Sequence, residues 1–281
     1  MEYEASAKRY WQEKLIVYLG DNLLQDGIKG YAAEFSSHNC DAMILLKEVE
    51  DPSKFGVAEI DGEGGLVKLI EKPKTPVSNY ALIGAYFLTP KIFPVIKRLK
   101  PSWRGEYEIT DALQGLIDEG CNVEYRTVKG WWFDTGKKDD VLTVNALILD
   151  RRGRRIVEGS VESSKVEGRV TIGKGTEIID SVVRGPAVIG EDCRVERSLI
   201  NPYASVGDRV KILNSSVEYS IIMEDSTIEG VDRIQESLIG RNSKIVKSGK
   251  GKFYRFHIAN HSELTLSTAE AGRLAYSPFD A

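Results

Sequence analysis

The chain has 281 residues, a formal net charge of -4 and 42% hydrophobic residues. This length predicts one or two domains with a real hydrophobic core. Lys and Arg are scattered without a basic block, which argues against a nucleic-acid partner. The longest apolar runs fall far short of the ~20 residues that a membrane helix needs, so no membrane partner is expected either.

The cysteines and the N-terminal residues indicate a cellular compartment. Cys40, Cys121 and Cys193 lie far apart, and no CxxC or Cys/His spacing suggests a zinc site. A sparse, odd set of cysteines is typical of a reducing cytosol rather than of a disulfide scaffold. The start of the chain is charged and has no apolar run like that of a signal peptide. We therefore expect a cytoplasmic protein.

Up to about residue 150, short apolar strands alternate with amphipathic helices. Residues 15–19 and 42–46 are continuous apolar runs, and a helical stretch from about Leu23 to Phe35 lies between them. Continuous apolar runs bounded by helices predict a parallel sheet that is covered on both faces.

The next segments predict a hairpin, a helix and two more strands. Residues 55–61 and 66–71 flank a glycine-bearing loop, which is typical of a hairpin. Residues 81–88 form another apolar strand. Thr110 and Asp111 can cap a helix that ends at Gly120, and a strand at 123–128 follows.

After residue 160 the aliphatic residues recur every six positions, with occasional steps of five, from Val166 to Ile245. Small or turn residues follow many of them, as in residues 172–176. A hexapeptide period predicts a parallel β-helix, whose coils must stack because a single coil cannot bury its own inner face. The five-residue steps are expected to be corners or bulges.

Two carboxylates are candidates for a metal site. Asp21 follows the apolar run 15–19, and Asp134 follows an aromatic segment. A carboxylate just past the end of a sheet strand lies where α/β proteins bind ligands, and Mg²⁺ prefers oxygen ligands there. Either residue can instead be a simple helix cap.

Charged residues elsewhere are candidates for phosphate binding. Glu71 and Lys72 lie at a strand end before a proline, which places a hydroxyl acceptor beside a phosphate-seeking ammonium. Arg104 lies in the loop before the helix that begins near Thr110. Taken as bare residues, such charges are more often solvated surface groups.

Several motifs follow one another at suitable spacings. They are YLGDN at 18–22, KFGVAEID at 54–61, LIEKP at 69–73, SNYALIGAYFL at 78–88, RGEYEITDAL at 104–113 and WWFDTG at 131–136. Together they resemble the sugar-phosphate nucleotidyltransferase family, in particular long glucose-1-phosphate thymidylyltransferases with a C-terminal hexapeptide-repeat domain.

The resemblance implies an α/β, truncated doubly wound (Rossmann-like) nucleotidyltransferase domain followed by a left-handed parallel β-helix. The implied boundaries are 1–150 for the catalytic part, 151–266 for the β-helix with a closing strand, and 267–281 for a tail.

The resemblance also implies a role for individual residues. Asp21 and Asp134 match the family's Mg²⁺ ligands, and Lys72 matches the lysine that contacts the sugar phosphate. Glu71 matches the residue that hydrogen-bonds sugar hydroxyls. The remaining positions complete the sugar-phosphate subsite: Arg104 is similar to an arginine that assists the lysine, and Gly56 and Gly84 match glycines that let backbone groups approach the sugar.

The implied reaction joins glucose-1-phosphate to dTTP and releases pyrophosphate. An oxygen of the sugar-1-phosphate attacks the α-phosphorus of the nucleoside triphosphate, and no protein nucleophile takes part. Catalysis then rests on positioning and on charge neutralisation.

The family's glycine-rich GxGTRL-type loop and downstream PK have no counterpart before Asp21. The expectation is an incomplete catalytic domain that is inactive by itself, with residues 15–19 as an exposed edge strand. The β-helix, over residues 160–248, is expected to self-associate as a trimer. One alternative is a non-catalytic sugar-phosphate-binding or oligomerisation subunit. Another is acyl transfer by the β-helix with His257 or His261 as a base. Neither the nucleobase nor the sugar is fixed by residues of this chain.

Overall fold

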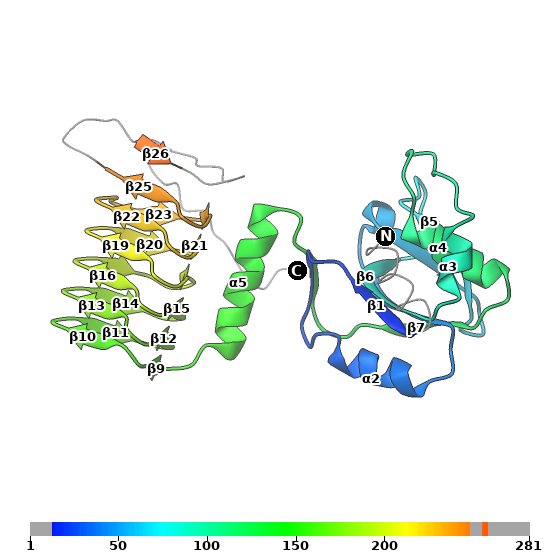
Figure 1. The fold of residues 1–281 in the computed structure, drawn as a ribbon, viewed down its shortest axis with the longest axis horizontal. Helices are drawn as coiled ribbons and strands as arrows, with labels where there is room; N and C mark the ends of the chain where they lie inside the picture. The colour runs from blue at the N-terminus through cyan, green and yellow to red at the C-terminus, as the bar shows by residue number, and fades with distance from the viewer. Residues whose placement is uncertain (1–12, 248–254, 258–281) are drawn as a thin grey trace, which may run out of the picture. The chain divides into compact units, whose positions relative to one another are not determined.

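The computed structural model describes residues 13–247 and 255–257, which fall into two units that divide between Gly136 and Lys137 (Figure 1). Layers of helix and sheet form the first unit, and stacked coils of short strands form the second. None of the helices among the described residues has the length and apolar character needed to cross a membrane.

A six-stranded mixed sheet forms the centre of the first unit. Its order is β5-β4-β6-β3-β7, and β1 pairs with β6. The strands are β1 (Leu15–Tyr18), β3 (Ala42–Glu48), β4 (Gly56–Ile60), β5 (Leu66–Glu71), β6 (Tyr80–Leu88) and β7 (Val123–Thr127), and a short 3-10 helix, η1 (Pro52–Lys54), precedes β4.

The expectation of a parallel sheet is wrong for its central strand. β6 runs antiparallel to β1, β3 and β4, whereas β3 and β7 are parallel. A continuous apolar run reports burial on both faces, and an antiparallel strand in the middle of a covered sheet is buried in the same way. The expected hairpin is confirmed, since β4 and β5 pair antiparallel.

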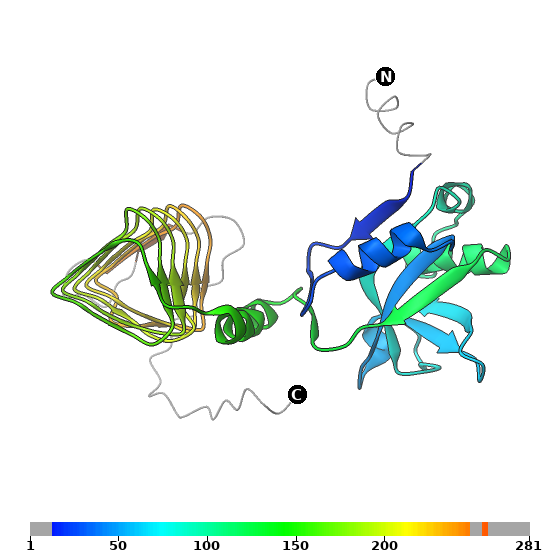
Figure 2. The same cartoon turned by 90° about the horizontal axis from the view of Figure 1, so that it is seen from below.

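Helices cover both faces of this sheet. Successive residues of β3 point to opposite faces, so Ile44 packs against α3 (Ile92–Ile96) and α4 (Ile109–Asp118), and Met43 packs against α2 (Lys29–Ser37). Figure 2 shows α2, in blue, along its face of the sheet. The doubly wound layering predicted from the sequence is therefore confirmed.

β1 is an edge strand of the described sheet, as expected. Its pairing partner within the described residues is β6, and Ile16 and Tyr18 are 46% and 40% exposed. The other face of β1 carries Leu15 and Val17, which are partly buried against the core.

The helix expected from about Leu23 to Phe35 is confirmed from Lys29 onward, as α2, but its predicted start is wrong. Residues Asn22–Leu24 form a strand, β2, that pairs antiparallel with β8 (Trp132–Asp134). Gly27 turns the chain with a φ of 67°, and α2 begins at Lys29. The pairing partner lies more than a hundred positions away, so a local pattern does not reveal it.

Three parallel sheets form the walls of the β-helix in the second unit. The first contains β10 (Ser160–Glu162), β13 (Glu177–Ile179), β16 (Arg194–Glu196), β19 (Lys211–Leu213), β22 (Thr227–Glu229), β25 (Lys244–Val246) and the antiparallel β26 (Arg255–His257). The second contains β11 (Lys165–Glu167), β14 (Val182–Arg184), β17 (Leu199–Ile200), β20 (Ser216–Glu218) and β23 (Ile234–Gln235). The third contains β9 (Ile156–Val157), β12 (Val170–Ile172), β15 (Ala187–Ile189), β18 (Ser205–Val206), β21 (Ile221–Ile222) and β24 (Leu238–Ile239).

The six-residue period is confirmed by the stacking of its aliphatic residues. Ile178 lies against Val195, which lies against Ile212, and each is fully buried. Most neighbouring coils are offset by 17 residues, as the hydrogen bond from Ser198 N to Ser181 Oγ shows, and Lys211 pairs with Thr227 at an offset of 16. Two sides of six residues and one of five account for an offset of 17, and one side of six with two of five for an offset of 16, so a five-residue step is a side that is one residue shorter.

Helix α5 (Lys138–Arg152) belongs to the β-helix unit. The side-chain amide of Asn145 donates to Tyr203 O at 3.0 Å, and its carbonyl accepts from Ser205 Oγ at 2.5 Å. The boundary between the two units therefore lies before α5. The change of sequence pattern alone suggests a boundary at about residue 150. The predicted tail, 267–281, lies outside the described residues.

Candidate functional site

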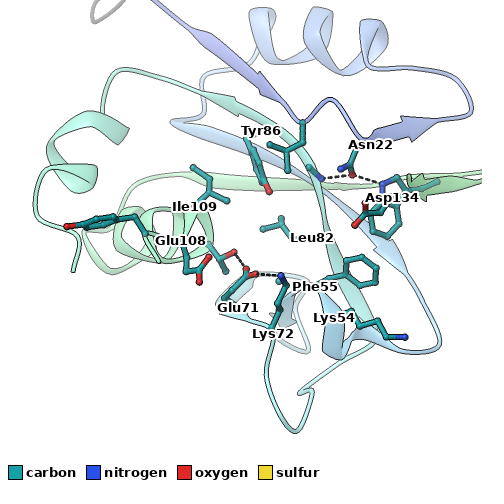
Figure 3. Close-up of a pocket in the computed structure, with 16 residues that line it drawn as sticks. Asn22, Lys54, Phe55, Glu71, Lys72, Leu82, Tyr86, Glu108, Ile109 and Asp134 are labelled. Carbon is teal, nitrogen blue, oxygen red and sulfur yellow. Dashed lines mark hydrogen bonds and ion pairs between the residues drawn. The ribbon is translucent and has the colours of Figure 1, made fainter. Parts of the chain in front are cut away.

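A cavity of about 330 Å³ opens in the first unit (Figure 3). Strands β4, β5, β6 and β8 and the start of α4 supply its walls. The structure brings together here most of the predicted site residues: Gly56, Glu71, Lys72, Gly84 and Asp134. Its volume is at the lower end of the range for small-molecule sites.

Glu71 and Lys72 both face this pocket although they are neighbours in sequence. Successive side chains of a strand point to opposite faces, but Lys72 has a φ of 40°, which turns the chain at the end of β5. Lys72 Nζ therefore lies 3.9 Å from Glu71 Oε1. A hydrogen bond from Lys72 N to Phe55 O at 3.0 Å holds the turn.

Thr110 fixes the Glu71 carboxylate. Its hydroxyl donates to Glu71 Oε2 at 2.5 Å, and Thr110 is 1% exposed. The predicted role of Thr110 and Asp111 as helix caps is wrong, because the N-cap of α4 is Glu108 and no side chain caps this end. Thr110 lies in the first turn, where its side chain can reach β5.

Gly56 allows this hydrogen bond to form. A Cβ on Gly56 would lie 3.0 Å from Thr110 Oγ1 and 3.2 Å from Glu71 Oε2. The absence of a side chain therefore lets β4 approach α4 and β5 closely, which places three elements around one carboxylate.

Alternate residues of β6 line the pocket floor. They are Leu82, Gly84 and Tyr86. The Tyr86 hydroxyl points into the cavity (Figure 3). Burial, reinforced by the charges of Glu71 and Asp21, raises the pKa of Tyr86, so the hydroxyl stays protonated and can donate a hydrogen bond.

Asn22 is a site residue that the sequence analysis missed. It is 4% exposed, and its Oδ1 accepts from Gly84 N at 3.0 Å and from Trp132 Nε1 at 2.8 Å. Its Nδ2 donates to Asp21 Oδ1 at 2.9 Å. A Cβ on Gly84 would lie 2.7 Å from Asn22 Nδ2, so glycine is needed there. The polar residue directly after Asp21 in a buried turn was the available signal.

Asp21 and Asp134 come together through the β2–β8 pair. Asn22 is the register partner of Asp134, and Thr135 donates from both N and Oγ1 to Asp21 O, at 2.7 and 2.8 Å. Neither aspartate caps a helix, because Asp21 precedes a strand and the N-cap of α5 is Lys137, without a side-chain cap. Asp134 lines the pocket, whereas Asp21 is exposed and meets the pocket-lining Asn22 through the hydrogen bond from Asn22 Nδ2.

These two carboxylates are suitable ligands for Mg²⁺. Within the described residues, no three His, Cys, Asp or Glu side chains converge as a ligand set. Mg²⁺ is commonly held by one or two carboxylates together with waters and phosphate oxygens of a ligand, so Asp21 and Asp134 could hold this ion.

Arg104 lies at the edge of the pocket among carboxylates. Its Nη1 is 3.7 Å from Glu71 Oε1 and 3.4 Å from Glu108 Oε1, and its Nη2 is 3.0 Å from Glu106 Oε2. Glu71 and Glu108 line the cavity, whereas Arg104 does not. The predicted phosphate-binding arginine is therefore near the site and already paired.

Comparison with known proteins agrees with this architecture. Residues 3–151 match the family described as nucleotidyl transferase. Over 259 residues the chain is 42% identical to the glucose-1-phosphate thymidylyltransferase of Streptomyces antibioticus, which covers 91% of this chain and 72% of that protein. A glucose-1-phosphate thymidylyltransferase of Streptomyces griseus is 39% identical over 259 residues, 92% of this chain and 73% of that protein.

An archaeal relative shows the same likeness. The low-salt glycan biosynthesis nucleotidyltransferase Agl11 of Haloferax volcanii is 38% identical over 235 residues, which is 83% of this chain and 66% of that protein. The chain belongs to the nucleotidyl transferase family. It is a sugar-1-phosphate nucleotidyltransferase similar to glucose-1-phosphate thymidylyltransferases, which confirms the resemblance drawn from its motifs.

Proposed function

We propose that the pocket binds glucose-1-phosphate, the sugar phosphate that the family reaction joins to dTTP to form dTDP-glucose and pyrophosphate. The observation that carries this proposal is the pairing of Glu71 and Lys72 on one wall of the cavity, 3.9 Å apart. A carboxylate accepts hydrogen bonds from sugar hydroxyls, and an ammonium beside it attracts the phosphate of the same molecule. The printed names of the two Streptomyces relatives support the choice of sugar and nucleotide.

Different residues of the pocket bind the sugar and the phosphate. Glu71, held by Thr110, accepts from sugar hydroxyls in a fixed orientation. The Tyr86 hydroxyl, kept protonated by its raised pKa, donates to the sugar. Lys72 neutralises the phosphate and holds its attacking oxygen in line with the nucleotide. Such positioning and charge neutralisation account for most catalysis of phosphoryl-type transfer.

Local charge gives Asp21 and Asp134 a metal-binding role in this proposal. Lys54 and Lys72 face three carboxylates, Glu71, Glu108 and Asp134, among the residues that line the pocket. This balance alone does not attract two anionic substrates. Mg²⁺ held by Asp21 and Asp134 would supply the positive charge that the triphosphate needs.

Titration calorimetry with glucose-1-phosphate tests the proposal. Lys72→Ala should weaken binding at least about tenfold, since a charge-assisted hydrogen bond is worth roughly 1.5–3 kcal/mol. Lys74→Ala is the matched control, because Lys74 is exposed and lies two positions away. Equal affinities of the wild type and Lys72→Ala would contradict the assignment.

We also propose that the chain self-associates through its β-helix. Parallel coils with a regular outer surface offer large, flat faces, and the family resemblance implies oligomers. Light scattering on the full chain at micromolar concentration should show an oligomer, for which a trimer is expected. A clean monomer would contradict this proposal.

Acyl transfer by the β-helix remains a hypothesis that no described contact supports. His257 lies in β26, the antiparallel strand next to β25. His261 lies outside the described residues.

A further inference from the structure

Arg104 is held by carboxylates of two different kinds. The side chain of Glu108 is 10% exposed, and its Oε1 accepts from Ser102 Oγ at 3.0 Å as well as facing Arg104. The side chain of Glu106 is 59% exposed, and Arg104 is its ion-pair partner, at 3.0 Å. The Glu108 carboxylate is therefore buried, whereas the Glu106 carboxylate is exposed to water.

Hydrogen bonds around Ser102 fix the loop that carries Arg104. Ser102 N donates to Glu106 O at 2.8 Å, and Gly105 N donates to Ser102 O at 2.8 Å. Ser102 Oγ also accepts from Arg104 N at 3.1 Å while it donates to Glu108. Glu108 therefore anchors both the backbone and the guanidinium of Arg104, whereas Glu106 contacts the guanidinium through its side chain.

We propose that Glu108 and Glu106 are positioning residues with opposite effects on phosphate binding. Glu108 anchors Arg104 beside the pocket, and Glu106 is a latch that competes with the phosphate for the same guanidinium. This inference rests on the proposed function, because it assigns the phosphate of the bound sugar as the incoming partner of Arg104.

The difference in exposure explains why Glu106 is the contact that Arg104 gives up. A guanidinium that turns toward a phosphate must exchange a carboxylate for it. Releasing Glu106 costs little, because water replaces Arg104 around an exposed carboxylate. Releasing Glu108 would leave a buried carboxylate without its cation, which is far more costly.

Calorimetry on the full chain tests the inference, with glucose-1-phosphate and inorganic phosphate as the probes and glucose as the uncharged comparison. Glu106→Gln should bind both phosphate-bearing ligands about two- to fivefold more tightly than the wild type, as expected for loss of an exposed competing ion pair. Glu108→Gln should bind them more weakly. Glucose should bind equally to the wild type and to Glu106→Gln.

A double-mutant cycle separates positioning from general charge. In an Arg104→Ala background, Glu106→Gln should change phosphate affinity no more than the control does. Glu119→Gln is the matched control, since Glu119 pairs with Arg98 at the surface and its side chain is 47% exposed.

The outcomes distinguish this inference from the proposed function. Unchanged or weaker phosphate binding by Glu106→Gln overturns the latch, and so does an equal gain when Arg104 is absent. A different result would contradict the proposed substrate while supporting the competing role of Glu106. In that case Glu106→Gln binds inorganic phosphate more tightly, but no variant binds glucose-1-phosphate. Glu106 is exposed, so its variant tests the latch even where Glu108→Gln fails to fold.

Discussion

The indole Nε1 of Trp132 donates a hydrogen bond to Asn22 Oδ1 at 2.8 Å, across 110 positions of sequence. The same oxygen accepts from Gly84 N at 3.0 Å. This buried amide oxygen thus joins β2, β6 and β8. The amide nitrogen of the same side chain, Nδ2, donates to Asp21 and fixes its position. The pocket wall and the proposed metal ligands therefore depend on Asn22.

Asn22→Ala is expected to loosen this junction. The substitution leaves the buried donors of Gly84 and Trp132 without an acceptor, which costs about 1–3 kcal/mol for each donor. Hydrogen exchange should show a faster amide at Gly84. Asn39→Ala, at an exposed position, is the control and should leave this amide unchanged. Slow exchange at Gly84 in Asn22→Ala would contradict the role of Asn22.

Gly56→Ala is expected to damage the sugar site. The new Cβ would lie 3.0 Å from Thr110 Oγ1 and 3.2 Å from Glu71 Oε2, so the hydrogen bond between them must shift. Overpacking of this kind costs about 1–3 kcal/mol, and affinity for glucose-1-phosphate should fall about tenfold. Gly62→Ala is the control, because a Cβ there meets nothing within 4 Å. A glucose-1-phosphate affinity equal to that of the control would refute the argument.

Stability of the first unit should depend on the ionisation of Asp41. A hydrogen bond from Lys91 holds the pKa of Asp41 below its ordinary value of 3.8. A depressed carboxyl pKa contributes stability that is fully present above pH 3.8 and is lost as the pH falls through the folded-state pKa. Asp41→Asn should therefore lower the free energy of unfolding by about 0.5–1 kcal/mol at pH 7, and this difference should shrink below pH 3.8.

Tryptophan fluorescence in urea measures this effect selectively, because Trp11, Trp103, Trp131 and Trp132 all precede residue 137. The double variant Asp41→Asn/Lys91→Met is the control and should lose no more stability than the single variants combined. A difference between wild type and Asp41→Asn that stays constant down to pH 3 would show that the Asp41 charge is not involved.

Ser198→Ala is expected to weaken the stacking of coils. Ser198 is 7% exposed, and its hydroxyl accepts from Ser215 N at 3.1 Å in the next coil. Removal of the hydroxyl leaves a buried N–H without a partner, at a cost of about 1–3 kcal/mol. Exchange of the Ser215 amide should accelerate, whereas Ser216→Ala on the outer face of β20 should have no such effect. Equal exchange rates in the two variants would refute the argument.

The sequence by itself determined the elements that local pattern controls. The β4–β5 hairpin, the end of α4 before Gly120 and the six-residue period of the β-helix all follow from neighbouring residues, because turn chemistry and side-chain periodicity act over a few positions. The ordered motifs also placed Gly56, Glu71, Lys72, Gly84 and Asp134 in one candidate site, and the structure gathers these residues around one cavity.

Only the tertiary structure decided what depends on contacts between distant segments. Leu23 and Leu24, predicted as helix, lie in a strand because β2 pairs with β8. Thr110 binds Glu71 instead of capping its own helix. The antiparallel course of β6 and the carboxylates around Arg104 have the same origin. In each case a hydrogen bond or ion pair between separate elements outweighs the secondary-structure propensity of a few residues. The sequence pattern of one segment does not indicate which distant segment it will contact.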